Sequence, residues 1–341
     1  MEVLKTLKST YGPCTNFLSK YGNGIIEARY VRKNPSYVAC YVSSHNGCKM
    51  GCLFCHLTQN NDITMNHVDI PTYGKQIRTV LNHYKKQVDV YNSVKATRCN
   101  INFMSKGDAL ANKYVVNEYD KLYNEMYKIC QEFELETKPN ISTIMPYTVK
   151  NHSLLNIFHD KPAYLYYSLY SLNSNFRKKW LPNAIPYQDA LDKLKEYQLI
   201  YNRVITFHWS IIKGQNDDIK EVNQLAKELR DRNFNGKLNI VRFNPHPNVS
   251  DEEASPEKVK EIFDILADVF KNPKSYIVPR LDVKTKTPCG MFVPLEELDK
   301  MQHKINKISE NSYTIDNDSH QFAEGVRNAE SKSLPGGFGQ S

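Results

Sequence analysis

The sequence has no long apolar run. Its mean hydropathy is -0.57, 40% of its residues are hydrophobic, and no stretch reaches the roughly eighteen apolar residues of a membrane-spanning helix. The N-terminal segment MEVLKTLKSTYGPC also lacks the apolar core of a signal peptide. We therefore expect a cytoplasmic globular protein with no membrane partner, in a reducing compartment where disulfides are rare.

Internal repeats and a strong charge imbalance are also missing. The 341 residues carry 45 Lys and Arg against 37 Asp and Glu, a net charge of +8. This modest excess suits a polyanionic partner such as RNA, because neutralised phosphates release counterions, but it is equally typical of a basic protein that is merely soluble. The length allows one large domain or two modest ones, and we expect a monomer.

Short β-rich runs alternate with longer amphipathic segments over most of the chain. Asp217 and Ser255 are placed to cap two of the expected helices, the second with Pro256 at its first position. The strands are expected at 37–43, 100–104, 139–145, 163–169, 203–211, 237–243 and 275–279. The helices are expected at 73–90, 113–134, 147–158, 186–201, 216–232 and 255–271.

This alternation predicts an α/β fold with a parallel sheet or an open, partial β6α6 TIM-like barrel. Residues 1–36 form an N-terminal extension in which a β-hairpin turns at Asn34 and Pro35 into the first core strand. The core spans 37–295. Residues 296–341 are expected to be a C-terminal helix and a flexible tail, because the polar end SLPGGFGQS is typical of a mobile terminus.

The eight cysteines need an explanation other than disulfides. Cys48, Cys52 and Cys55 form a C-x3-C-x2-C motif within SSHNGCKMGCLFCHL. Three thiolates on one loop leave one metal position open, and a [4Fe-4S] cluster held by three cysteines has an iron free to bind another ligand. The alternative is a zinc site with His45 or His56 as fourth ligand.

This motif directly after a first barrel strand resembles the radical S-adenosylmethionine (SAM) superfamily. The flanking YVSSHNGCKMGCLFC is similar to the radical SAM RNA adenosine methyltransferases, which methylate C2 or C8 of adenine in ribosomal RNA and, in some members, C2 in tRNA. Six further segments resemble that family in order and spacing: FMSKGDALAN, NISTI, YSLYSLNSNFRKKWLPNA, ITFHWSIIKGQND, NIVRFNPHP and PCGMF. Only 47 residues precede Cys48, so most of the family's usual N-terminal domain has no counterpart.

The resemblance implies a radical SAM core barrel and a cofactor pair. Cys48, Cys52 and Cys55 would hold the [4Fe-4S] cluster, and SAM would chelate its open iron. One electron into the cluster would cleave SAM to a 5'-deoxyadenosyl radical. The matching SAM-binding positions lie at the ends of expected strands, and they are Gly107, Asp108, Ser142, Ser168 and Asn244.

Cys289 matches the cysteine that this family methylates and then uses to carry the one-carbon unit to adenine. The family resolves the resulting crosslink with a second cysteine seven residues before the cluster motif, where this sequence has Tyr41. Cys40 fits if one residue is inserted between it and the loop, and Glu27 then matches the family's general base. An insertion in the hairpin turn near Asn34 would put Tyr41 in the site instead. Because Cys40 and Tyr41 point to opposite faces of a strand, only one of them can serve.

The resemblance thus predicts a methyltransferase acting on an adenine carbon in rRNA or tRNA. C2 is favoured because it is the family's commoner target, and a flavodoxin-type electron donor is expected by analogy. Two alternatives stay open. One is a radical SAM enzyme that modifies a nucleotide or a protein, and the other is an RNA-binding protein with impaired turnover.

Overall fold

The computed structural model describes residues 2–10, 12–91 and 94–294. Its framework is one ten-stranded sheet in which every strand lies beside the next one in the chain. The strands are β1 (Val3–Lys8), β2 (Cys14–Tyr21), β3 (Gly24–Val31), β4 (Tyr37–Tyr41), β5 (Arg98–Phe103), β6 (Glu136–Thr143), β7 (Tyr164–Tyr167), β8 (Ile205–Trp209), β9 (Gly236–Ile240) and β10 (Tyr276–Ile277).

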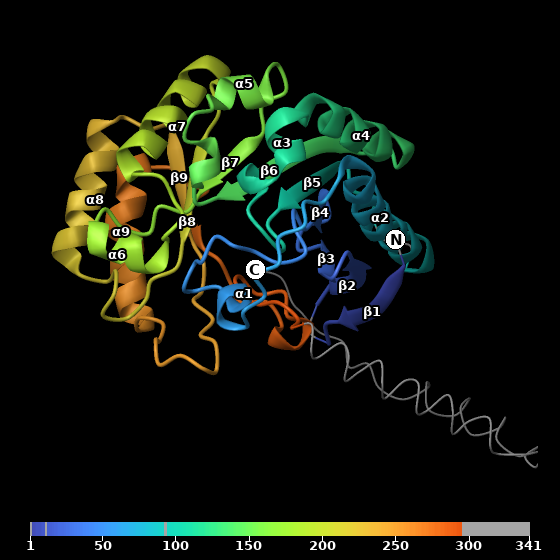
Figure 1. Cartoon of the computed structure of the whole chain (residues 1–341), viewed down its shortest axis with the longest axis horizontal. Coiled ribbons are helices and arrows are strands. Elements are labelled where there is room, and N and C mark those ends of the chain that lie inside the picture. The colour runs from blue at the N-terminus through green and yellow to red at the C-terminus, as the bar shows by residue number, and fades with distance from the viewer. Residues whose placement is uncertain (1, 11, 92–93, 295–341) are drawn as a thin grey trace, which may run out of the picture. The chain divides into compact units, whose positions relative to one another are not determined.

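Strands β4 to β10 are parallel, whereas β1 to β4 pair antiparallel at one end of the sheet. The sheet curves, and helices cover its outer side (Figure 1). Within the described residues β1 and β10 are the two edges of this sheet. The α/β fold predicted from the alternation, a barrel that stays open, is therefore confirmed.

Helices of four to 22 residues lie in the connections between the parallel strands, which cannot be joined by a tight hairpin. They are α1 (His56–Gln59), α2 (Ile70–Tyr91), α3 (Lys113–Asn117), α4 (Tyr119–Glu132), α5 (Leu154–Phe158), α6 (Ser174–Trp180), α7 (Tyr187–Tyr201), α8 (Ile219–Asp231) and α9 (Pro256–Phe270). Within the described ranges no helix combines the length and apolarity that a membrane crossing needs.

Each expected strand of the core is present, with its ends shifted by a few residues. The expected helix at 113–134 is divided into α3 and α4, and the one at 147–158 shortens to α5. The periodicity of the sequence predicts neither β1 and β2 nor the short helices α1 and α6. The predicted helix and tail at 296–341 lie outside the described residues.

The N-terminal residues are an integral part of the sheet. β3 and β4 form the expected hairpin, and the side chain of Asn34 accepts a hydrogen bond from the backbone N–H of Ser36 in its turn. β2 pairs along its whole length with β3. Since β2 and β3 are almost entirely buried, this hairpin continues the barrel wall and supplies side chains to the site described below.

Alternation along each strand separates an inner from an outer face. On β4, Val38 and Cys40 are fully buried in the core beneath the helices, whereas Tyr37, Ala39 and Tyr41 belong to the opposite face. The outer faces of the strands and the helices together form one large apolar core. The polar residues on the inner faces of the strands are therefore not needed for this core and can line a binding site.

Two helix caps test the local sequence reasoning. Ser255 caps α9 as predicted, and its side chain accepts a hydrogen bond from the backbone N–H of Lys258. The expected cap Asp217 is wrong by one residue. Asp218 caps α8, accepting from Lys220 at 2.7 Å, and Asp217 instead accepts from the N–H of Gly214 in the preceding turn.

Replacing Asp218 by Ala should therefore destabilise the protein by about 1 kcal/mol, because two N–H groups of the first turn of α8 lose their acceptor. Asp217→Ala, its neighbour and matched control, removes one bond in an exposed turn and should cost less. Thermal melting of both variants under identical anaerobic conditions measures the difference. A melting temperature lowered at least as much by Asp217→Ala would contradict this assignment of the cap.

Candidate active site

A pocket of about 140 Å³ lies at the carboxyl ends of the parallel strands, where barrels of this kind place their active sites. Its wall combines residues from loops far apart in the sequence. Eight of the eleven residues singled out from the sequence line it: Cys48, Cys52, Cys55, Gly107, Asp108, Ser142, Ser168 and Cys289. Cys40, Glu27 and Asn244 do not.

The three motif cysteines lie on the loop between β4 and α1. This loop is not part of a strand, and backbone hydrogen bonds tie it to other segments of the chain. Cys48 donates its N–H to the carbonyl of Asp62, and Leu53 donates its N–H to the carbonyl of Trp180. Gly51 has φ of +68°, a conformation that a side chain would strain, and it allows the loop to curl. Phe54 stacks on Tyr170 with ring centroids 4.6 Å apart and closes one side of the pocket.

The thiols of this loop are close to one another and shielded from water. Burial raises the pKa of Cys48 to about 11 and that of Cys55 to about 12, and the pKa of Cys52 rises because of burial and the neighbouring thiols Cys48 and Cys55. These thiols interact electrostatically, so their thiolate forms repel one another unless a positive group lies between them. An iron-sulfur cluster provides that charge, so the donor set fits one.

A zinc site finds less support in the geometry. In the part of the chain that the structure describes, no three His, Cys, Asp or Glu side chains, the motif thiols included, converge on the position of a single metal ion. His56 Nε2 bonds the carbonyl of Asn244 at 2.9 Å, and His45 Nε2 lies 3.3 Å from His67 Nδ1. Both candidate fourth ligands thus have other partners.

Gly107 and Asp108 follow β5 at the strand end. Gly107 has φ of +85° and packs against the ring of His45, so that a side chain would collide with it. The carboxylate of Asp108 accepts hydrogen bonds from the N–H groups of Leu110 and Ile144, both at 2.9 Å. Burial raises the pKa of Asp108 to about 6, so this fixed carboxylate would gain from a nearby cation.

The other predicted SAM-binding residues divide into two groups. Ser142 and Ser168 lie at the carboxyl ends of β6 and β7 and line the pocket. Asn244, in the loop after β9, instead donates a hydrogen bond from Nδ2 to the carbonyl of Cys289 at 3.0 Å. Its side chain thus helps to hold the loop that carries Cys289.

The loop carrying Cys289 lies against α1, as the orange-red segment of Figure 1 shows, and the carbonyl of Gly290 accepts the N–H of His56 at 2.9 Å. Cys289 is solvent-accessible, yet the protein atoms around it raise the pKa of its thiol to about 11, against the opposite effect of the Arg29 guanidinium. Its thiol also lies close enough to Cys55 for their charges to interact.

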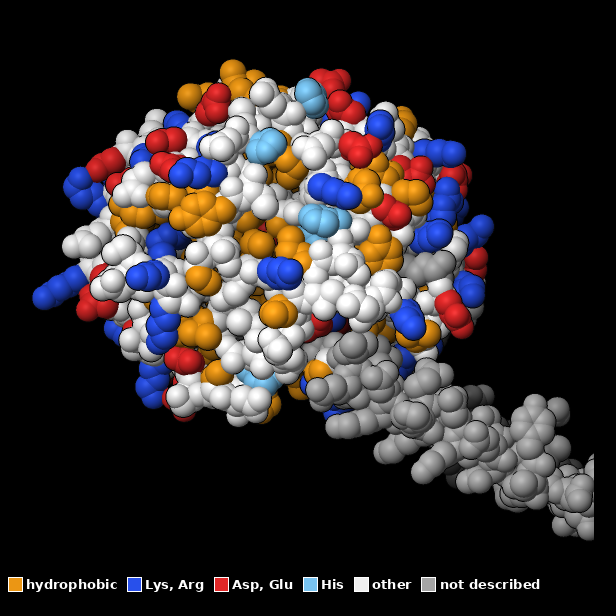
Figure 2. All heavy atoms as spheres, in the orientation of Figure 1, with side chains coloured by type: hydrophobic (Ala, Val, Ile, Leu, Met, Phe, Trp, Pro, Cys, Tyr) orange, Lys and Arg blue, Asp and Glu red, His pale blue; other side chains and the backbone are white. Residues whose placement is uncertain are grey.

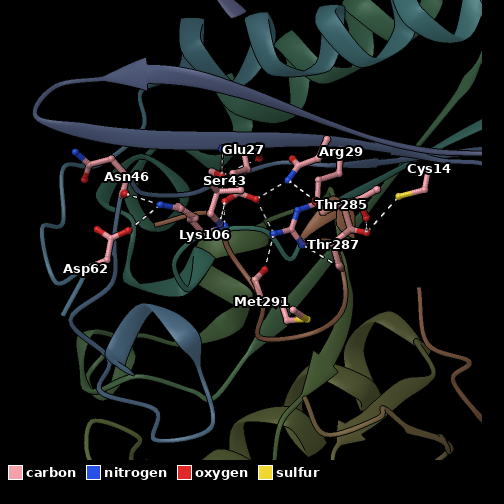
Figure 3. A network of polar contacts seen from close by, with 12 residues as sticks. Cys14, Glu27, Arg29, Ser43, Asn46, Asp62, Lys106, Thr285, Thr287 and Met291 are labelled. Atoms are coloured by element: carbon pink, nitrogen blue, oxygen red, sulfur yellow. Dashed lines mark hydrogen bonds and ion pairs between the residues drawn. The ribbon is translucent and has the colours of Figure 1, made fainter. Parts of the chain in front are cut away.

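The β2–β3 hairpin holds this loop from the other side (Figure 3). Arg29 donates to the carbonyls of Thr287 and Met291 and forms an ion pair of 2.8 Å with Glu27. The second oxygen of Glu27 accepts the N–H of Val293 at 2.9 Å. Both charged side chains are almost completely buried, so they form a clamp that fixes the backbone on either side of Cys289.

Glu27 therefore has no opening to the pocket. Its carboxylate accepts from Arg29, from Val293 and from Asn16, whose Nδ2 lies 2.9 Å away and also bonds the carbonyl of Thr285. A general-base role would require one of these bonds to open. Neither Arg29 nor Asn16 carried any signal in the sequence, because isolated polar residues within a strand have no characteristic spacing.

Cys40 lies on the outer face of β4. It is fully buried in the core beneath the helices, and its thiol interacts with that of Cys99 on β5. Tyr41 occupies the inner face, as strand alternation requires. The Cys40 side chain thus points away from the pocket, and its catalytic role stays a prediction.

A second buried ion pair joins the two loops that form the pocket (Figure 3). Lys106, directly before Gly107, is fully buried, and its ammonium lies 2.7 Å from the carboxylate of Asp62, whose backbone carbonyl accepts the N–H of Cys48. Lys106 also donates to the carbonyl of Asn46 at 3.5 Å. Sequence reasoning missed this brace because its two charges are far apart in the chain.

No protein-family model matches the chain. Curated relatives are dual-specificity RNA methyltransferases RlmN. That of Oleidesulfovibrio alaskensis is 26% identical over 263 residues, covering 75% of this chain and 68% of the relative. That of Nitratiruptor sp. is 27% identical and covers 70% and 62%, and that of Syntrophobacter fumaroxidans is 28% identical and covers 76% and 70%. The chain thus matches about two thirds of their length, and slightly less for the Nitratiruptor protein.

Among solved structures, a radical SAM methyltransferase from Sphaerobacter thermophilus superposes with a TM-score of 0.70. The match covers 85% of this chain and 80% of that one at 18% sequence identity. At this identity the likeness establishes the fold alone, an open, partial barrel that the two chains share.

Removing Asp62 and removing Lys106 should destabilise the protein by different amounts. Asp62→Ala leaves an ammonium with no exposed surface unpaired and should cost about 3–5 kcal/mol. Lys106→Met keeps the length of the side chain and leaves Asp62, whose side chain is 14% exposed, partly solvated, so it should cost less. Chemical denaturation of both variants measures their free energies of unfolding. Equal losses of stability, or a larger loss for Lys106→Met, would contradict the role of this ion pair.

Proposed function

We propose, on the premise that the chain belongs to the radical SAM enzymes of the RlmN type, that it is an RNA methyltransferase acting on an adenine carbon. One observation carries the proposal. The three motif cysteines, the strand-end carboxylate Asp108 and the isolated Cys289 line a single pocket although they come from three separate segments of the chain. A cluster, a sulfonium cofactor and a methyl-accepting thiol need to be brought together in this way.

The cofactors of this family are a [4Fe-4S] cluster and SAM, which together supply a 5'-deoxyadenosyl radical by one-electron cleavage. Cys48, Cys52 and Cys55 hold the cluster. Asp108 presents a carboxylate whose orientation is fixed by two backbone N–H groups, and it receives the ammonium of SAM. Ser142 and Ser168 contact the same cofactor from the neighbouring strands.

Cys289 is the residue that accepts a methyl group before passing it to the base. Its thiol has to lose a proton first, and the protein atoms around it oppose this step by raising the pKa of the thiol to about 11. Arg29 favours the thiolate, and Glu27 fixes Arg29 while bonding the backbone beyond Cys289. We assign Glu27 and Arg29 as positioning residues for this loop.

The target position is C2 of adenine, which the family uses more often than C8, and the electron donor is of the flavodoxin type by analogy. The face of the molecule seen in Figure 2 has mostly uncharged groups in its middle, with scattered Lys and Arg side chains, and basic and acidic side chains mixed around its edge. RNA recognition on this face therefore depends on shape and on individual contacts more than on one basic patch.

A second reading, RNA binding with impaired turnover, is favoured by one observation. Cys40, the candidate second thiol, is directed into the core and away from Cys289. An enzyme without a resolving thiol can transfer its methyl group once and then remain attached to its product.

Each of the variants Cys48→Ser, Cys52→Ser and Cys55→Ser should lose most of the iron and sulfide bound after anaerobic reconstitution, because the hydroxyl is a poor ligand for iron. Cys99→Ser, a buried cysteine on the outer face of β5, is the matched control and should keep its iron. Iron content and visible absorption measure the effect. Zinc in the reconstituted protein, or full iron binding by the triple variant, would refute the cluster assignment.

Incubation of the reconstituted protein with SAM and a reductant should add one methyl mass to the peptide containing Cys289, and Cys289→Ala should abolish methyl transfer to RNA. Peptide mass spectrometry and nucleoside analysis measure the two. Many 2-methyladenosines per chain would support a turning-over enzyme, whereas one or fewer, with RNA retained on the chain, would support the second reading. RNA methylation by Cys289→Ala would exclude the proposed route.

A further inference from the structure

The opposite end of the barrel carries a group of positive charges that the proposed function does not use. Side chains two residues apart on a strand share a face, so Lys138 lies on the same inner face of β6 as Ser142, and Lys237 on the inner face of β9. Lys138 is four residues before Ser142, which places it about 13 Å from the cysteine pocket along the strand. These lysines thus lie at the amino ends of the parallel strands.

A cavity of about 460 Å³ opens beside them. Four lysines line it and no Asp or Glu does. Its wall also contains Tyr164, Tyr166 and Phe270. A volume of this size is within the range of small-molecule sites, which is roughly 300–1,000 Å³.

The lysines have no carboxylate partner. In the described part of the chain, none of the ion pairs within 4 Å includes Lys138, Lys237, Lys271 or Lys274. Aromatic rings contact two of them instead. The ammonium of Lys138 lies 3.9 Å from the centroid of Tyr164, and that of Lys237 lies 5.8 Å from the centroid of Tyr166.

The charges also repel one another. Burial lowers the pKa of Lys138 to about 8, and Arg98, Lys237 and Arg203 act in the same direction, opposed by Glu136. The guanidinium of Arg203 shares the ring of Tyr164 with Lys138, at 4.5 Å from its centroid. Partly buried like charges without a counterion destabilise a fold, so their presence calls for an anion.

The C-terminus of helix α9 can stabilise the charges of only two of these four lysines. Lys271 is its C-cap and Lys274 follows it, and cations at the carbonyl end of a helix are favourable without any ligand. Lys138 and Lys237 come from strands and gain nothing from a helix terminus. Lys138 and Lys237 are therefore the two cations that call for an anion.

We propose that this cavity is a second ligand site, which binds the phosphate group of a nucleotide or of an RNA strand between Lys138 and Lys237. Ammonium groups are common phosphate ligands, and the tyrosine rings beside them offer surfaces for a base. The site is separate from the cysteine pocket and does not depend on the proposed methyl transfer.

The test uses the reconstituted full chain with saturating SAM, so that the cysteine pocket is occupied. Inorganic pyrophosphate, uridine diphosphate and a single-stranded RNA oligomer are titrated at constant ionic strength, with chloride as reference, and binding is measured by calorimetry. Lys138→Met/Lys237→Met should weaken binding of at least one probe tenfold or more. The control is Lys227→Met, which removes the charge of one exposed lysine on α8 and should leave binding unchanged.

The melting temperature of the same double variant, measured without ligand, is a second test. Because it relieves repulsion among the cations, it should melt at the temperature of the wild type or above it, whereas loss of a purely structural pair would lower that temperature. Pyrophosphate or uridine diphosphate binding that depends on the two lysines would identify a nucleotide site, and binding of the RNA alone would identify a strand-binding site. No binding of any probe at millimolar concentration, or binding equal in wild type and double variant, would overturn the proposal.

Discussion

The site depends on two long loops that lie against the carboxyl end of the sheet. These loops are not strands, so the hydrogen bonds of the sheet do not hold them in place. The loop with the three motif cysteines and the loop with Cys289 contain few hydrogen bonds of their own, and the order of both comes from bonds to other segments. Two buried ion pairs supply much of this order, Glu27 with Arg29 and Asp62 with Lys106. Burying charge is costly, and it is tolerated here because each ion pair also bonds backbone groups of the loops.

This arrangement explains why the N-terminal strands belong to the same sheet. A barrel of parallel strands alone could present the cysteine loop, but it would leave the Cys289 loop without a partner on one side. The β2–β3 hairpin adds that partner, and its inward side chains, Asn16, Glu27 and Arg29, bond the backbone at Thr285, Thr287, Met291 and Val293. The hairpin thus has a function in positioning, which a peripheral extension would not.

Much of the fold could be predicted because its signals are local. Strands such as β7 and helices such as α9 have the period and capping residues that the sequence displays. β1 and β2 were missed because their burial depends on pairing with β3, which periodicity alone does not reveal. The cap of α8 was misplaced by one residue because Asp217 and Asp218 are chemically equivalent, and only the path of the backbone distinguishes them.

The site was predictable where several residue types must occur together at a fixed spacing. The cysteine motif and the segments of Asp108 and Cys289 carry such patterns, and the structure brings them into one pocket. The braces could not be predicted, since an ion pair between residues 44 positions apart, such as Asp62 and Lys106, has no sequence signature. Resemblance identified the loops but not the side chains that hold them in place.

The side chains of β4 alternate between the outer core and the inner face of the sheet, and this alternation separates Cys40 from Tyr41. Val38, Cys40 and Val42 are all fully buried in the outer core, and the regular bond from Val42 N–H to the carbonyl of Asn102 continues the alternation beyond the strand. An insertion between Cys40 and the cluster loop would interrupt this alternation, whereas one in the β3–β4 turn would not. The inner position therefore belongs to Tyr41. Among the described residues lining the pocket, every sulfhydryl is a motif cysteine or Cys289 itself, so Cys40 contributes no second thiol to this pocket.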